Sequence, residues 1–202
     1  MKDNMARGEG TPARQTKRKE TTMKPKRVWA LLLALGMLAL AVCGCQKEQS
    51  VEEWEAKELE RVKHYMKALR FYDAEGVYFE TGEGWVKAQP VVLYFWASRT
   101  PESLKGLAVV QQAYEKYGEE VQFLVVNTFD GSADTMEDAA EVLREGGYTF
   151  PVCYDREKCL ERDLLVRTLP YVLFLKRGAE VVHVRNTVLT AEEMDAMIAD
   201  IR

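Results

Sequence analysis

Residues 90–96 form an unbroken run of apolar, β-prone side chains, Pro-Val-Val-Leu-Tyr-Phe-Trp. A run this short cannot cross a membrane as a helix. Its lack of polar alternation is typical of a strand that is buried on both faces. Strands of this kind occur mainly in sheets that are covered by helices on both sides. The segment therefore predicts an α/β fold.

The rest of the chain after this run alternates between helical and strand patterns. Asp155 is placed to cap a helix, and Thr190 with Glu193 forms a capping box. The segment from Phe71 to Pro90 is ambiguous, with glycines that indicate turns. The order β-α-β-α-β-α-β-β-α predicts a central mixed sheet flanked by helices. Further helices are expected over 104–117, 134–145, the residues after 155 and 190–201, and further strands over 121–126, 150–154, 171–176 and 180–185.

An export signal precedes this domain. Residues 28–42 are apolar and follow a basic stretch, which is the usual pattern of such a signal. The run ends at Cys43-Gly44-Cys45 and then turns polar, which resembles the lipobox of bacterial lipoproteins. A small residue precedes the lipidated cysteine there, and Gly44 fits that place. We therefore expect lipid on Cys45 and anchoring at the outer face of the cell membrane; an uncleaved membrane anchor is the alternative.

The signal divides the chain into parts with different expected roles. Residues 1–22 are polar and basic, and Met23 begins a normal signal by itself, so the first part is either a gene-model extension or a disordered arm. The remaining parts are a signal peptide (23–44), a lipidated tether (45–53), an amphipathic helix packed on the domain (54–70) and the α/β domain (71–202).

The charge of the exported part argues against a nucleic-acid partner. The full chain of 202 residues has a net charge of −4. Residues 1–44 hold nine Lys/Arg and three Asp/Glu, which leaves 19 and 29 in residues 45–202 and a net charge of −10. A domain this acidic lacks the basic surface that nucleic acids require. The expected partners are the membrane, through lipid on Cys45, and an extracytoplasmic protein or peptide.

Three landmarks, in order, resemble the TlpA/ResA-like redoxin branch of the thioredoxin superfamily. They are residues 90–98, ending in Phe-Trp-Ala-Ser, then Phe150-Pro151-Val152 with Asp155, and residues 166–178, which contain Leu169-Pro170. The resemblance covers about residues 70–202, including the extra helix that separates this branch from plain thioredoxins. It implies a thioredoxin-like fold, a cis-proline at Pro170, and kinship with thiol-disulfide oxidoreductases, which are commonly exported and membrane-tethered.

The redox motif of that branch is missing from this chain. The family expects Cys-x-x-Cys two residues after Ser98, where this sequence has Thr100-Pro101-Glu102-Ser103. Hydroxyls can neither form a thiolate nor exchange a disulfide. The same four residues suit a helix start, with Thr as N-cap, Pro at the first helical position and Glu in the first turn. We therefore expect no thiol chemistry at Thr100 and Ser103, and whether the chain is an enzyme stays open.

Cys153 and Cys159 are the cysteines of the α/β domain. A structural disulfide is the first interpretation in an oxidising compartment, and buried unpaired thiols are the second. A relocated redox pair is the third, and it would make the chain a thiol-disulfide oxidoreductase after all. His64 and His183 lack the ligand spacing of a zinc site, so no metal or cofactor is expected.

In active relatives the wall beside the cis-proline helps to bind a substrate peptide in extended form. A groove of this kind does not need the cysteines and can recognise an extended peptide through aromatic and polar contacts. The resulting prediction is a peptide- or protein-binding or assembly module. The side chains expected to contribute are Trp96, Arg99, Thr100, Leu169, Pro170 and Tyr171.

Overall fold

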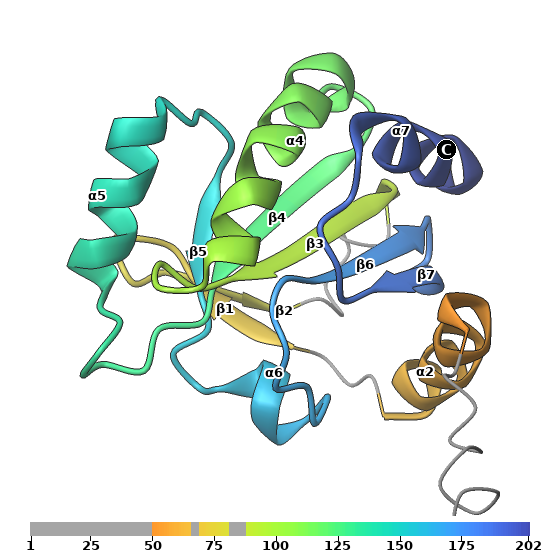
Figure 1. Ribbon diagram of the computed structural model, residues 1–202, viewed down its shortest axis with the longest axis horizontal. Coiled ribbons are helices and arrows are strands. Elements are labelled where there is room, and N and C mark those ends of the chain that lie inside the picture. The colour runs from red at the N-terminus through yellow and green to blue at the C-terminus, as the bar shows by residue number, and fades with distance from the viewer. Residues whose placement is uncertain (1–49, 66–68, 81–87) are drawn as a thin grey trace, which may run out of the picture. The chain divides into compact units, whose positions relative to one another are not determined.

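The computed structural model describes residues 50–65, 69–80 and 88–202. Cys45, the signal segment and most of the tether lie outside these residues. The described chain forms a seven-stranded mixed sheet of order β2-β1-β5-β4-β3-β6-β7 (Figure 1). The strands are β1 (Arg70–Tyr72), β2 (Tyr78–Glu80), β3 (Val91–Trp96), β4 (Gln122–Asn127), β5 (Val152–Tyr154), β6 (Tyr171–Lys176) and β7 (Glu180–Arg185). The helices are α2 (Val51–Tyr65), α4 (Pro101–Tyr117), α5 (Met136–Gly146), α6 (Cys159–Arg162) and α7 (Ala191–Ile201).

Strand β3 is an inner strand, and all six of its residues are buried, as its unbroken apolar run predicts. It pairs in parallel with β4 and antiparallel with β6. Alternate side chains of β3 enter two separate hydrophobic clusters. A strand with two apolar faces therefore needs helices on both sides of the sheet, and the predicted α/β architecture is confirmed.

The helices divide between the two faces of the sheet. Helices α4, α5 and α7 pack on one face, and α2 and α6 pack on the other (Figure 1). Leu107, Val110 and Ile198 belong to the first cluster. Val62 and Leu160 belong to the second. Both clusters are built from the apolar stripes of amphipathic helices.

Helix α4 approaches strand β3 closely near its first turn. A Cβ atom at Gly106 would lie 2.0 Å from the hydroxyl oxygen of Tyr94, so any larger residue would displace that ring. The Tyr94 hydroxyl donates a hydrogen bond of 2.8 Å to the carbonyl oxygen of Ser103. This buried contact fixes the beginning of α4 over the sheet.

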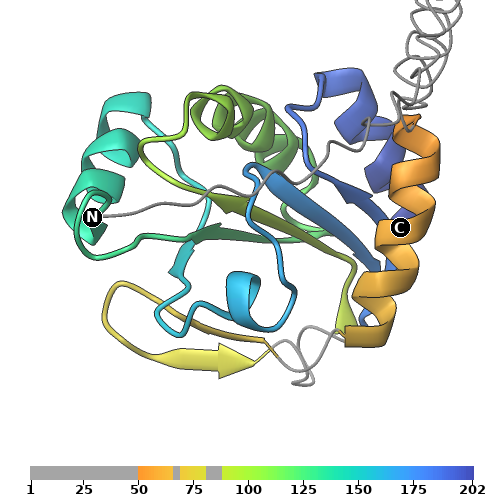
Figure 2. The same cartoon turned by 60° about the horizontal axis from the view of Figure 1, so that its bottom comes forward.

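Helix α2 runs along strand β7, as Figure 2 shows. Trp54, Leu59 and Val62 pack against the same core cluster as the strand. Its bounds, 51–65, differ from the 54–70 that the periodicity suggests, because Arg70 already belongs to β1. None of the helices in the described part of the chain is long and apolar enough to span a bilayer.

Helix α6 is shorter than the leucine spacing suggests. It ends at Arg162, and Leu165 takes a left-handed conformation with φ of 54°. Leu164 and Val166 are both buried, so the residue between them must point outward, and Leu165 is 62% exposed. Burial of the two flanking side chains thus outweighs the helical preference of the segment. Asp155 still holds the helix start, since its carboxylate accepts hydrogen bonds from the backbone N–H groups of Cys159 and Leu160.

Candidate functional site

The loop after β3 leads directly into helix α4, as the sequence predicts. Thr100 is the N-cap residue, with extended backbone angles, and Pro101 begins the helix. The Thr100 side chain makes no capping hydrogen bond, which differs from the expected role of its hydroxyl. The helix start therefore depends on the backbone and on Pro101, whose fixed φ is already helical.

Thr100 and Ser103 differ sharply in exposure. Thr100 is half-buried, whereas Ser103 is fully buried beneath the first turn of α4. Within the described residues, no hydrogen-bond partner contacts the Ser103 hydroxyl. A serine nucleophile needs an adjacent base to take its proton. The geometry therefore supplies no activated nucleophile at this position.

Buried polar groups gather at the carboxyl ends of β3, β4 and β5. The buried serine, asparagine and aspartate side chains of the described chain all lie there: Ser98, Ser103, Asn127, Asp134 and Asp155. The loop after β3 is anchored to the next loop, because the Ser98 backbone N–H donates to Asp134 over 2.8 Å. The carboxyl ends of parallel strands are where α/β proteins bind their ligands.

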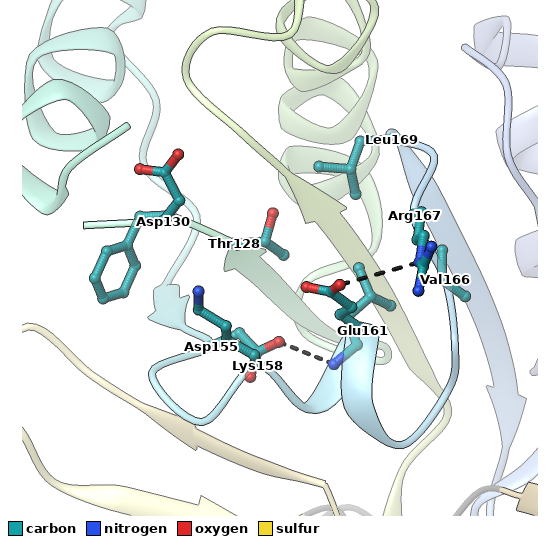
Figure 3. A pocket seen from close by; sticks show the side chains of 10 residues that line it. Thr128, Asp130, Asp155, Lys158, Glu161, Val166, Arg167 and Leu169 are labelled. Carbon is teal, nitrogen blue, oxygen red and sulfur yellow. Dashed lines mark hydrogen bonds and ion pairs between the residues drawn. The ribbon is translucent and has the colours of Figure 1, made fainter. Parts of the chain in front are cut away.

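A cleft of about 330 Å³ opens at this same end (Figure 3). Its apolar contacts come from Phe129 after β4, Leu160 on α6, and Val166 and Leu169 in the loop before Pro170. Charged and polar side chains surround these apolar residues, so the cleft combines an apolar surface with a few polar groups, as small-ligand and peptide sites do. The polar lining residues are Thr128, Asp130, Asp155, Lys158, Glu161 and Arg167.

The carboxylates of the cleft are held by backbone N–H groups. Burial raises the pKa of Asp155, against the opposing effect of its hydrogen bonds from Leu160 and Cys159. Hydrogen bonds from the backbone of Asp134 and Ser132 lower the pKa of Asp130 to about 2. On the facing wall, Arg167 lies 4.0 Å from Glu161 (Figure 3). The cleft thus presents both signs of charge around its apolar surface.

The structure brings together only part of the predicted groove. Leu169 lines the cleft and precedes Pro170 through the expected cis peptide bond. Arg99 is exposed and lies 3.4 Å from Asp138. Trp96 and Tyr171 do not line this cleft, because their side chains are 0% and 1% exposed and belong to the core.

Both aromatic residues belong to inner strands of the sheet, where alternate side chains enter the two cores. Phe129, Lys158, Leu160 and Arg167 were not predicted. Phe129 was within reach of the sequence, because it lies three residues beyond the end of the strand predicted over 121–126. Lys158 and Leu160 lie at the start of α6 and Arg167 lies in the loop before Pro170, and the sequence does not reveal that these segments meet at one cleft.

Cys153 and Cys159 are both free and buried. Of the three interpretations of this pair, the structure has the buried unpaired thiols. Burial raises the pKa of the Cys153 thiol to about 12 and that of Cys159 to about 11. At neutral pH both groups are protonated, and a protonated thiol is a poor nucleophile. These environments disfavour the relocated redox pair.

Comparisons with known proteins extend the resemblance to three dimensions. No protein-family model and no curated protein sequence matches the chain. Among solved structures, StoA from Bacillus subtilis superimposes with a TM-score of 0.55 at 21% identity, covering 65% of this chain and 96% of its own. A secreted Mycobacterium tuberculosis disulfide oxidoreductase superimposes with a TM-score of 0.55 at 16% identity. The match covers 70% of this chain and 98% of that protein.

The exposed lipoprotein thioredoxin Etrx1 from Streptococcus pneumoniae gives a TM-score of 0.54 at 18% identity, covering 66% of this chain and 99% of its own. The matched proteins are thus covered almost completely. Their sequence identity to this chain is low, so the similarity lies in the fold of the backbone. The chain therefore has a thioredoxin-like fold, as its three sequence landmarks predict.

Proposed function

We propose that this protein is an exported, lipid-anchored thioredoxin-like module that binds a segment of another protein in the cleft beside Leu169. In this proposal it does not exchange disulfides at Thr100 and Ser103. The observation that carries the proposal is the combination of an open cleft at the carboxyl ends of the strands with hydroxyl side chains at the expected redox positions.

The chemistry of the cleft supports a peptide ligand. Phe129, Leu160 and Leu169 offer an apolar surface for a side chain, while Lys158 and Arg167 offer donors to carbonyl or carboxylate groups. Peptide sites combine such pockets with polar contacts to the main chain. The cleft volume is also within the lower part of the range typical of ligand sites, about 300–1,000 Å³.

A site-specific crosslink tests the binding proposal in the living cell. A photo-crosslinking amino acid in place of Lys158, at the edge of the cleft, should yield defined adducts with one or a few proteins. The matched control places the same amino acid at Arg144, an exposed position on α5. Equal adduct patterns at the two positions, or none at 158, would contradict binding at the cleft.

Export and lipid attachment rest on the sequence and are tested separately. Metabolic labelling with a fatty acid should mark the full-length chain, and Cys45→Ala should abolish the label. Cys43→Ala serves as the control, because Val42 before it is too large for the residue that precedes a lipidated cysteine. Labelling that survives Cys45→Ala would leave the uncleaved anchor as the better interpretation.

A further inference from the structure

We propose that Glu58 and Arg61 on helix α2 are positioning residues for the cleft. They hold the loop of residues 164–169, which forms one wall, and thereby couple the docking of α2 to ligand binding. The part of this inference that concerns ligand binding rests on the proposed function. The part that concerns the loop rests on contacts within the described chain alone.

Two hydrogen bonds connect one turn of α2 with the chain at the beginning of this loop and just after its end. The Arg61 guanidinium donates to the carbonyl oxygen of Leu164. The hydroxyl of Tyr171, just after Pro170, donates to Glu58 over 2.8 Å. Arg61 and Glu58 are also joined to each other by a two-point ion pair. One bond thus holds the first residue of the loop, and the other holds the first residue of β6, just beyond the end of the loop.

The ion pair is well suited to this task. The side chains of Arg61 and Glu58 are only 26% and 14% exposed. Burial acts to raise the pKa of Glu58, but the hydrogen bonds from Arg61 and Tyr171 outweigh it and hold the pKa below its usual value. The carboxylate is therefore ionised and accepts from both partners. A planar guanidinium can serve a carboxylate and a carbonyl group at once, which an ammonium on a lysine cannot match.

The loop is a shared wall between two cavities. Val166 and Arg167 line the cleft of about 330 Å³ and also a second cavity of about 240 Å³. Helix α2 lines only the second cavity, through Trp54, Glu58 and Arg61. A shift of the loop away from α2 would consequently narrow one cavity and widen the other.

The conformation of the loop depends on outside support. Leu165 has a φ of 54°, a region that a leucine side chain disfavours, and it is mostly exposed. Such conformations persist when the surrounding structure determines them. The neighbouring residues provide this support, since Val166 N–H bonds to Leu160 and Arg61 bonds to the carbonyl of Leu164. Loss of Arg61 removes the hydrogen bond by which α2 holds the carbonyl group of Leu164.

Hydrogen exchange on the purified full-length chain tests whether α2 holds the loop. We expect Arg61→Met to accelerate exchange of the amides in residues 164–169 at least tenfold, with the amides of β3 unchanged. Arg61→Lys should restore little of the protection. Lys63→Met is the control, because Lys63 pairs with the exposed Glu60 and neither residue lines the cavity that the loop shares with α2. Unchanged exchange in the loop, or an equal rise throughout the domain, would overturn the positioning role.

The crosslink at position 158 tests the coupling to the ligand. Position 158 lies on the opposite side of the cleft from the loop, so Arg61→Met does not alter the probe itself. We expect the adduct yield to fall at least threefold in Arg61→Met and to stay constant in Lys63→Met. Equal yields would overturn the coupling. Absence of any adduct in the unmodified chain would refute the proposed function instead, while the exchange result would still decide the role of Arg61 and Glu58.

Discussion

The backbone N–H of Ser98 donates a buried hydrogen bond of 2.8 Å to the carboxylate of Asp134. This bond ties the loop before α4 to the loop before α5. The next residue, Thr135, begins α5 with a complete capping box. A single carboxylate thus fixes the position of the Thr100 loop relative to a neighbouring helix.

Asp134→Ala should destabilise the domain by about 1–3 kcal/mol, because it leaves the buried Ser98 N–H without an acceptor. Urea unfolding of the purified chain measures this difference. Glu137→Ala, at an exposed position in the first turn of α5, should change stability by no more than about 0.5 kcal/mol. If the two variants had the same free energy of unfolding, the hydrogen bond between Ser98 and Asp134 would not contribute to stability.

Ser103→Ala should leave stability unchanged or raise it by up to about 1 kcal/mol, since it removes a buried hydroxyl that has no partner. Thr135→Ala, which removes a hydroxyl with a capping partner, should cost about 1 kcal/mol. Thermal unfolding of both variants gives the comparison. A clear loss in Ser103→Ala would mean that its hydroxyl has a stabilising contact.

The double substitution Thr100→Cys and Ser103→Cys should create a reactive dithiol. A cysteine at the N-cap of α4 gains from the helix N-terminus, which lowers the pKa of a thiol. We expect the new pair to oxidise readily, as counted by alkylation and mass spectrometry, and the protein to reduce insulin. Ser103→Cys alone is the control. A folded double variant that never forms the disulfide would show that the loop differs from that of redox-active relatives.

Stability should fall between about pH 8.5 and pH 10, because a thiol has an ordinary pKa of about 8.5 in the unfolded chain. The folded state raises the pKa of Cys159 to about 11 and that of Cys153 to about 12 by burial. A raised pKa means that the folded state retains the proton, so this contribution is complete below about pH 8.5 and is lost as pH rises.

Urea unfolding at pH 8 and pH 10 measures the fall. The variant with Cys153→Ala and Cys159→Ala should lose less stability over that interval. Burial also raises the pKa of Tyr94 and Tyr171. Because the ordinary pKa of tyrosine is near 10, their ionisation lowers stability mainly above pH 10. The same slope in both proteins would indicate that the thiols ionise freely in the folded state.

Glu55→Gln should weaken the attachment of α2 to the sheet. The Glu55 carboxylate pairs with Arg185 and lies 3.3 Å from Nδ1 of His183, and the side chains of Glu55 and Arg185 are each 17% exposed. Removal of the charge leaves the arginine largely buried without its partner, which should cost about 1–3 kcal/mol. Glu53→Gln, on the exposed side of the helix, is the matched control. Calorimetry measures the thermal unfolding of the two variants. An unchanged Glu55→Gln transition would show that apolar contacts alone hold α2.

The sequence by itself determined the fold class and the succession of helices and strands from residue 90 onward, because these follow from local patterns. Each of these patterns depends only on residues that are neighbours along the chain. They are the apolar run of β3, the capping box of α7 and the landmark that contains Pro170. The sequence also determined that Thr100 and Ser103 carry hydroxyl groups, which cannot perform thiol chemistry however they are packed. It did not predict β1 and β2, which fall mainly in the segment from Phe71 to Pro90 that it left ambiguous.

Only the tertiary structure decided which side chains line the cleft. Trp96 and Tyr171 face the core because of their strand register, which depends on pairing across the sheet. Cys153 and Cys159 are free and buried in the same core cluster, a state that the sequence left open. The link from Glu58 to Tyr171 joins residues 113 positions apart, and no local pattern encodes such a contact. Local chemistry sets the elements, whereas burial and long-range contacts set the cleft.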